Sequence, residues 1–225
     1  MNHKPLFEFQ GAAILFDMDG TLVDSMAHDE RQWTRWAAHH GLDPRPILTI
    51  SHGRRTLETI REVAPHLATE QELVRFEKQE LEDREGMRAV DGAAALLRVL
   101  PPQSWALVTS APRRLAELRM ESAGLSLPAV VVSADDVLRG KPDPEGVLRA
   151  ARLLDAAPAE CLVIEDTPAG IQAAHAAGMR ALGITTTYTC EQLGTRPCIA
   201  NFHGFRLLQP ERPRARVHLA LIALA

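Results

Sequence analysis

Four short polar segments of the 225-residue chain carry the side chains that phosphoryl transfer to an aspartate requires. They are Asp17-Met18-Asp19-Gly20-Thr21, Thr109-Ser110, Lys141-Pro142 and Glu165-Asp166. Three of the four directly follow short apolar runs typical of buried strands, at residues 13–16, 105–108 and 162–164. Because ligands of open α/β sheets bind at the carboxyl ends of the strands, these side chains are predicted to meet at one site.

The two aspartates of the first segment suit two different tasks. Asp17 is the candidate nucleophile, which would attack phosphorus and form an aspartyl-phosphate. Asp19, two residues later, is the candidate general acid and base, because it could give a proton to the leaving oxygen and later take one from water. Gly20 permits a tight turn after the strand. A turn or a helix N-cap uses the same residue types, so this segment alone does not decide between chemistry and local structure.

Positive charge and fixed donors are needed where a carboxylate approaches a phosphate dianion. Thr109 and Ser110 precede a helix predicted to start near residue 112, where free backbone N–H groups bind anions. Lys141 is one of three lysines beside 22 arginines, and it lies in a proline-rich loop where a fixed ammonium could bridge nucleophile and phosphate. Each segment also has an ordinary alternative, since Ser and Thr begin many helices and most lysines are solvated.

Glu165 and Asp166 provide the hard oxygen ligands that Mg²⁺ prefers. We predict that Asp166 binds the ion directly, together with Asp17 and the carbonyl oxygen of Asp19, and that Glu165 acts through water. The alternative is that the acidic pair stabilises the start of the helix that follows at Pro168, where the helix dipole favours negative charge. Both interpretations can hold at once.

The elements that must position these residues follow from the hydrophobic pattern. Residues 25–87 contain no strand-like run, and their apolar residues recur at helical spacing, which predicts an insert of about four helices with breaks near 41–44 and 51–53. From residue 91 onward helix and strand alternate, which indicates βαβ units and a parallel sheet. The predicted strands are 105–109, 129–133, 160–164 and 180–184, and the predicted helices are 91–100, 112–123, 144–156 and 168–177. The segment after Pro210 is left open between a docking helix and a frayed end.

Composition excludes several classes of partner. The net charge of -4 and the pI near 6.1, with no basic patch among aromatic residues, argue against nucleic acid. No apolar stretch reaches the roughly 18 residues of a membrane span, and the N-terminus lacks the apolar core of a signal peptide. We therefore expect a cytoplasmic protein. We also expect it to be a monomer whose partner is a small phosphorylated substrate. Cys161, Cys190 and Cys198 lack metal-ligand spacing and are expected to be reduced thiols.

Together the motifs resemble those of the haloacid dehalogenase-like hydrolases, specifically the phosphatases with a helical cap after the first strand. The resemblance extends from Ile14 to about Asn201, and it is carried by the segments 15–25, 140–144 and 165–171. It implies a Mg²⁺-dependent phosphomonoesterase of the α/β class. Its Rossmann-like parallel sheet core (1–24 and 88–225) would be flanked by helices, with an inserted helical-bundle cap domain (25–87). It also implies phosphate binding by Thr109 and Lys141, and metal binding by Asp17, Asp19 and Asp166.

Comparison within the family narrows the reaction. Dehalogenases attack carbon and lack the second aspartate, whereas this chain has both Asp19 and Asp166. Phosphonate-cleaving members use a cap lysine, and the only lysine between residues 24 and 88 is Lys78, far from the expected cap loop. Mutases carry a histidine shortly after the first motif, where this chain has Asp29 with His28 beside it. Phosphate-ester hydrolysis is the favoured activity.

The segment from Ser51 to Thr56 is similar to the substrate-specificity loop of small sugar and polyol phosphatases, including those acting on 2-deoxyglucose-6-phosphate and glycerol phosphate. His52, Gly53, Arg54 and Arg55 are the candidate specificity residues, and the alternative is a helix start with solvated arginines. Trp33 and Trp36 are expected to pack inside the cap. The cap is expected to act as a lid.

Four alternatives stay open: a β-phosphoglucomutase-like phosphomutase, a nucleotide phosphatase, a glycolate phosphatase and a non-catalytic sugar-phosphate binding protein.

Overall fold

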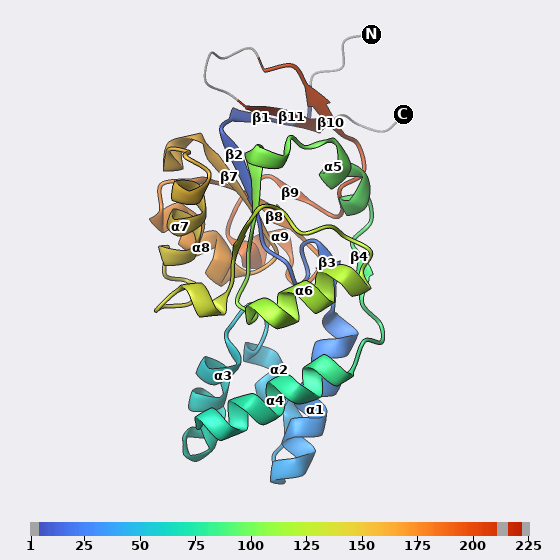
Figure 1. Cartoon of the computed structure of the whole chain (residues 1–225), viewed down its shortest axis with the longest axis vertical. Coiled ribbons are helices and arrows are strands. Elements are labelled where there is room, and N and C mark those ends of the chain that lie inside the picture. The colour runs from blue at the N-terminus through green and yellow to red at the C-terminus, as the bar shows by residue number, and fades with distance from the viewer. Residues whose placement is uncertain (1–4, 211–215, 222–225) are drawn as a thin grey trace.

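The main sheet of the computed structural model has six parallel strands in the order β6-β5-β2-β7-β8-β9 (Figure 1). The structure describes residues 5–210 and 216–221. The sheet strands are β2 (Ala13–Phe16), β5 (Trp105–Val108), β6 (Val130–Val132), β7 (Cys161–Glu165), β8 (Arg180–Ile184) and β9 (Cys198–Ile199). The predicted α/β class with a parallel sheet is confirmed.

Helices cover both faces of this sheet. One face packs against α5 (Ala93–Val99) and α6 (Arg113–Ser122), and the other against α7 (Glu145–Leu153) and α8 (Pro168–Ala176). The central strand β2 illustrates why, because Ile14 and Phe16 join one hydrophobic cluster while Ala13 and Leu15 join the other. Successive side chains of a strand point to opposite faces, so a strand buried on both sides is apolar throughout.

The predicted helical insert lies between two short paired strands, β3 (Val23–Asp24) and β4 (Arg88–Ala89). It contains α1 (Met26–His40), α2 (Pro44–Ile50), α3 (Thr56–Val63) and α4 (Glu70–Glu82), and α1–α4 are called the helical insert from here on. Its own hydrophobic cluster includes Trp33, Trp36 and Phe76, with the Trp33 and Phe76 rings 4.5 Å apart. The two tryptophans therefore pack in the interior of the insert, as predicted.

A second sheet, which the sequence analysis missed, joins the two ends of the described chain. Its antiparallel order is β1-β11-β10, formed by β1 (Phe7–Gly11), β11 (Val217–Leu221) and β10 (Phe205–Leu208). Residues 217–221 thus form a strand, and neither expectation for the segment after Pro210 holds for them. The physical reason is alternation, because Val217 and Leu219 face the core while His218 between them bonds to polar partners.

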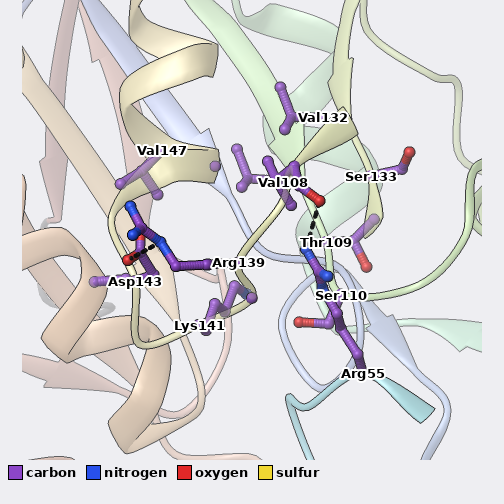
Figure 2. Close-up of a pocket in the computed structure, with 14 residues that line it drawn as sticks. Arg55, Val108, Thr109, Ser110, Val132, Ser133, Arg139, Lys141, Asp143 and Val147 are labelled. Carbon is purple, nitrogen blue, oxygen red and sulfur yellow. Dashed lines mark hydrogen bonds and ion pairs between the residues drawn. The ribbon is translucent and has the colours of Figure 1, made fainter. Parts of the chain in front are cut away.

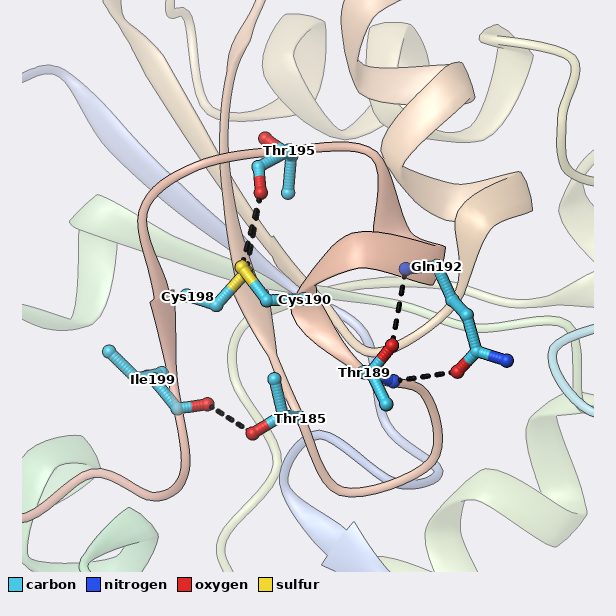
Figure 3. Close-up of a disulfide and its surroundings, with 7 residues drawn as sticks. All are labelled: Thr185, Thr189, Cys190, Gln192, Thr195, Cys198 and Ile199. Atoms are coloured by element: carbon cyan, nitrogen blue, oxygen red, sulfur yellow. Dashed lines mark hydrogen bonds between the residues drawn. A yellow bond between two sulfur atoms is a disulfide. The ribbon is translucent and has the colours of Figure 1, made fainter.

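The cysteine prediction is wrong for two of the three residues. Cys190 and Cys198 form a disulfide (Figure 3), with their Cα atoms 5.8 Å apart. Cys161 is a buried free thiol. The short helix α9 (Cys190–Leu193) and the turn at Gly194 reverse the chain. Strand β9 therefore returns beside α9. This reversal brings two cysteines eight residues apart into bonding distance.

The remaining elements are single turns of 3₁₀ helix: η1 (Pro65–Leu67), η2 (Pro102–Ser104), η3 (Ala134–Asp136) and η4 (Pro158–Glu160). Within residues 5–210 and 216–221, none of the helices combines the length and apolar character needed to cross a membrane.

Candidate active site

The turn after β2 places Asp17 at the carboxyl edge of the sheet. The backbone N–H of Asp17 donates to Ile164 O at 3.0 Å, which extends the pairing of β2 with β7 by one residue. Gly20 follows with φ of +75°, a conformation that favours glycine, and its N–H donates to Val23 O at 2.8 Å. A Cβ on Gly20 would lie 2.0 Å from Asp166 Oδ2. Glycine at this position therefore allows the first and fourth polar segments to meet.

Lys141 lies against Asp17, as the sequence predicts. Its Nζ atom is 2.5 Å from Asp17 Oδ1 and 3.2 Å from Glu165 Oε2, and its side chain is only 10% exposed. Burial works against the charged ammonium, but the carboxylates of Asp17 and Glu165 outweigh it and raise the pKa of Lys141. Lys141 is therefore a fixed positive charge beside the candidate nucleophile.

Three carboxylates form a compact group that suits a divalent cation. One oxygen each of Asp17, Glu165 and Asp166 lies within 4.8 Å of the others, and all three residues are buried. Burial raises the pKa of Asp166, and the neighbouring carboxylates of Glu165 and Asp17 raise it further. Buried carboxylates so close together repel each other, and a hard cation with oxygen preference would offset that repulsion. The chemistry of this donor set fits Mg²⁺.

Neighbouring hydroxyl groups orient these carboxylates. Thr187, in the loop after β8, donates to Asp166 Oδ2, and Thr167 donates to Glu165 Oε1. Thr167 also caps α8, because its side chain accepts from Gly170 N at 3.2 Å. The capping role considered for the acidic pair therefore belongs to the residue that follows it.

The Asp19 carboxylate points to a different set of partners. Its Oδ1 atom is 2.6 Å from Arg119 Nη1 on α6 and accepts a hydrogen bond of 2.7 Å from Ser25 Oγ. Arg119 Nη2 in turn lies 2.7 Å from Asp29 Oδ1 and 2.9 Å from Glu80 Oε1, both in the helical insert. Burial raises the pKa of Asp19, although Arg119 opposes this shift.

Thr109 and Ser110 line a pocket with Lys141 and Arg55 (Figure 2). Thr109 Oγ1 accepts from Ala111 N at 3.1 Å, which fixes the turn after β5. Ser110 Oγ donates to Gly53 O at 2.8 Å, so a residue of the core contacts the predicted specificity loop. The pocket therefore borders both the candidate phosphate-binding residues and the helical insert.

The loop at 51–55 divides its side chains between two directions. Arg55 Nη2 donates to Val137 O at 2.8 Å and so reaches the core, whereas Arg54 pairs at 2.6 Å with Glu62 inside the insert. Gly53 has φ of +73°, and a Cβ there would lie 2.7 Å from Thr167 Cγ2. Burial opposes the shift, but Arg119 and, to a smaller extent, His28 and His52 lower the pKa of Asp29.

The structure therefore brings together Asp17, Lys141, Glu165 and Asp166, and it places Thr109, Ser110 and Arg55 around the adjoining pocket. Asp19 and Arg54 direct their charged groups to other partners.

The sequence analysis missed several residues that contact the candidate site, among them Arg119 and Thr187. Arg119 follows Leu115 by four residues on α6, so a charged residue on the apolar face of the helix was the available signal. Thr187 follows the predicted strand 180–184 at the same sheet edge as the other segments, which was the signal for a role near Asp166.

Comparison with known proteins agrees with the motifs. Residues 12–178 match the model of the haloacid dehalogenase-like hydrolase family. The chain is 42% identical to hexitol phosphatase A of Escherichia coli over 76% of this chain and 81% of that protein. It is 33% identical to glycerol-1-phosphate phosphohydrolase 2 of Saccharomyces cerevisiae, covering 87% and 82% of the two chains. A hydrolase from Pseudomonas syringae has a similar crystal structure, with a TM-score of 0.72 and 25% identity over 82% of this chain and 89% of that one. The comparisons confirm both the predicted family and the expectation of a phosphatase.

Proposed function

This chain belongs to the haloacid dehalogenase-like hydrolases, and from that premise we propose that it hydrolyses the phosphate ester of a small sugar or polyol through an aspartyl-phosphate on Asp17. The observation that carries the proposal is the buried contact of Lys141 with Asp17 beside the carboxylates of Glu165 and Asp166. A carboxylate held by a fixed ammonium at a sheet edge can approach a phosphate that would otherwise repel it.

Mg²⁺ is the cofactor we propose. Asp17 and Asp166 would hold it with the carbonyl oxygen of Asp19, and Glu165 would act through water. When bound, the ion would neutralise charge on the phosphate and on the clustered carboxylates. Because these carboxylates are buried together, magnesium is also expected to stabilise the fold.

The reaction would proceed in two displacements by residues of this chain. An Asp17 oxygen would attack phosphorus as the bond to the sugar oxygen breaks, and Asp19 would give that oxygen its proton. Asp19 would then take a proton from water as the water attacks phosphorus and the bond to Asp17 breaks, releasing phosphate. The raised pKa of Asp19, caused by burial, suits the protonated form that the first step requires. Thr109, Ser110 and Lys141 would bind the phosphate oxygens.

Substrate choice is assigned to the helical insert. We propose that residues 1–24 and 88–225 form the catalytic core, that residues 25–87 form a cap, and that the loop with His52, Gly53, Arg54 and Arg55 selects the substrate. The hydrogen bonds of Ser110 to Gly53 O and of Arg55 to Val137 O support this proposal, because they join the loop to residues that line the pocket. The curated relatives named above act, by their names, on hexitol and glycerol phosphates, which supports a polyol or sugar phosphate here.

A screen of phosphate release tests this proposal. The purified chain, with Mg²⁺, is assayed against hexose, pentose, hexitol, glycerol, glycolate and nucleotide phosphates, and each positive reaction is repeated with a chelator. We expect magnesium-dependent release that is fastest with a polyol or sugar phosphate. Activity confined to nucleotide or glycolate phosphates would contradict the substrate class. Isomerisation of a sugar phosphate without net phosphate release would contradict hydrolysis and support a mutase.

A further inference from the structure

Arg119 is a buried cation that joins the candidate acid/base residue to the helical insert. Its side chain is 5% exposed and contacts three carboxylates within 2.9 Å. We propose that Arg119 is a positioning residue that couples docking of the helical insert to the orientation of the Asp19 carboxylate. This inference rests on the proposed role of Asp19 as acid and base.

The two arms of the guanidinium have separate partners. Nη1 contacts Asp19 Oδ1 at 2.6 Å, while Nη2 contacts Asp29 on α1 at 2.7 Å and Glu80 on α4 at 2.9 Å. Arg119 itself belongs to α6, which lies along α4 at the junction between the sheet and the insert (Figure 1). A planar fork can hold two groups in a fixed mutual geometry, which the single ammonium of a lysine cannot do. One side chain therefore connects the insert to the catalytic turn.

The contact fixes Asp19 without occupying the whole carboxylate. Oδ1 receives both Arg119 Nη1 and the hydroxyl of Ser25, so one oxygen is anchored from two directions. Neither of these contacts uses Oδ2. Anchoring of one oxygen in this way sets the direction of the other, which general acid and base catalysis requires at the leaving oxygen.

The position of the guanidinium depends on the carboxylates. Among residues 5–210 and 216–221, the buried Nε–H group of Arg119 has no hydrogen-bond acceptor, so the two Nη atoms make the contacts that hold the guanidinium. Arg119 lowers the pKa of Asp29 in spite of the opposing effect of burial, so Asp29 carries the negative charge that anchors Nη2. If the insert moved away, Asp29 and Glu80 would leave, and Nη2 would lose both anchors. The orientation of Asp19 would then no longer be fixed by the docked insert.

A double-mutant cycle between Asp29 and Arg119 tests the coupling. Asp29→Asn keeps the shape of the side chain and removes its charge, and Arg119→Lys keeps the charge and removes the fork. With the best substrate of the phosphate-release screen, we expect Asp29→Asn to lower kcat about tenfold while KM changes less than about twofold. In the Arg119→Lys background the same substitution should lower kcat by less than about twofold, because the connection is already broken.

The matched control is Glu121→Gln. Glu121 also lies on α6 and forms an ion pair with Arg84, just beyond the end of α4, at 3.4 Å, but this pair is exposed and does not include Arg119. Glu121→Gln should leave kcat and KM unchanged, which separates loss of an ion pair at the junction from loss of positioning. Thermal unfolding of each variant checks the fold. If Arg119→Lys does not fold, the kcat values of Asp29→Asn and Glu121→Gln still show whether the ion pair of Asp29 contributes to catalysis.

Asp19→Asn, assayed in parallel, separates failure of this inference from failure of the proposed function. Loss of activity in Asp19→Asn together with unchanged kcat in Asp29→Asn would overturn the role of Arg119 alone. Kinetic effects of Asp29→Asn and Arg119→Lys that simply multiply would overturn it as well. Full activity of Asp19→Asn would instead remove the acid/base assignment on which the inference depends.

Discussion

Lys141 and Asp17 show how much of the candidate site depends on individual buried charges. The ammonium and the carboxylate are both nearly buried, and each stabilises the charged form of the other. For this reason, loss of the Lys141 charge should disturb the ionised state of Asp17, which loss of an exposed lysine would not do.

Replacement of Lys141 should therefore reduce catalysis strongly. Lys141→Gln removes the positive charge beside Asp17, and we expect kcat/KM for phosphate release to fall by about 10²–10³. Lys78→Gln is the control, because Lys78 on α4 is 76% exposed and its ion-pair partner Glu82 is exposed as well. Equal activity of the Lys141 and Lys78 variants would show that the ammonium beside Asp17 has no part in the reaction.

Glu80 predicts a specific pH dependence of stability. Burial raises its pKa from 4.5 to about 8, with Arg119 opposing and the carboxylates of Asp29, Asp19 and Glu77 adding to the shift. Between these two values the folded state holds a proton that the unfolded state releases, so the contribution of Glu80 to stability is lost as the pH rises toward 8. The loss is at most about 1.4 kcal/mol per pH unit.

Glu80→Gln has no such proton to release. The free energy of unfolding of Glu80→Gln, measured by urea denaturation, should therefore rise relative to the wild type between about pH 5 and about pH 8. A constant difference between the two proteins across that range would mean that the pKa of Glu80 is not raised in the fold.

At the residue scale, the sequence predicted that Lys141 lies beside Asp17, because a lysine in a proline-rich loop could bridge the nucleophile and the phosphate at the strand ends where the other three segments lie. It did not predict the partners of Asp19. Arg119, Asp29 and Glu80 lie on three helices from two parts of the chain, and helical periodicity alone cannot tell which faces of separate helices meet.

At the scale of elements, the loop between α2 and α3 brings the helical insert to the sheet edge, where Ser110 Oγ donates to Gly53 O at 2.8 Å. Gly53 combines a left-handed backbone with a position against Thr167, where a Cβ would lie 2.7 Å from Cγ2. Thr167 in turn contacts Glu165 and caps α8. A larger residue at position 53 would displace the loop from Ser110.

Gly53→Ala should therefore impair activity beyond its effect on stability. Gly41→Ala is matched to it, because Gly41 has a similar φ of +67° but nothing within 4 Å of the added Cβ. Both variants are expected to lose about 1 kcal/mol of stability from backbone strain. Only Gly53→Ala should lower kcat/KM, by about tenfold, in steady-state assays with the best substrate. Equal kcat/KM in the two glycine variants would contradict a role for this loop in the active state.

The elements of the parallel sheet were predictable, and those at its margin were not. Strands such as 105–108 and 161–165 are buried on both faces and therefore stand out as apolar runs. The strand Phe7–Gly11 has alternating exposure and pairs with a strand more than 200 residues later, so its pattern is weaker and its partner is distant. The disulfide was missed because it depends on the reversal of the chain around α9.

At the scale of the whole molecule, four helices are inserted after the first strand of the main sheet, and we propose that this insertion separates catalysis from substrate choice. Three of the four polar segments and Lys141 share the carboxyl edge of the sheet with the pocket at Ser110, while the helical insert supplies the loop and the carboxylates that approach this edge. The sequence indicated this organisation, because the insert lacks strand-like runs. It could not indicate which contacts join the two parts.

The central claim is that Asp17 is the nucleophile of a phosphatase. Phosphate release by Asp17→Asn, measured with Mg²⁺ and the best polyol or sugar phosphate, tests it most directly, with thermal unfolding to verify that the variant is folded. We predict that the folded variant loses at least about a thousandfold in kcat, because an amide cannot form the phosphoenzyme. A folded Asp17→Asn protein with wild-type, magnesium-dependent activity would contradict the account.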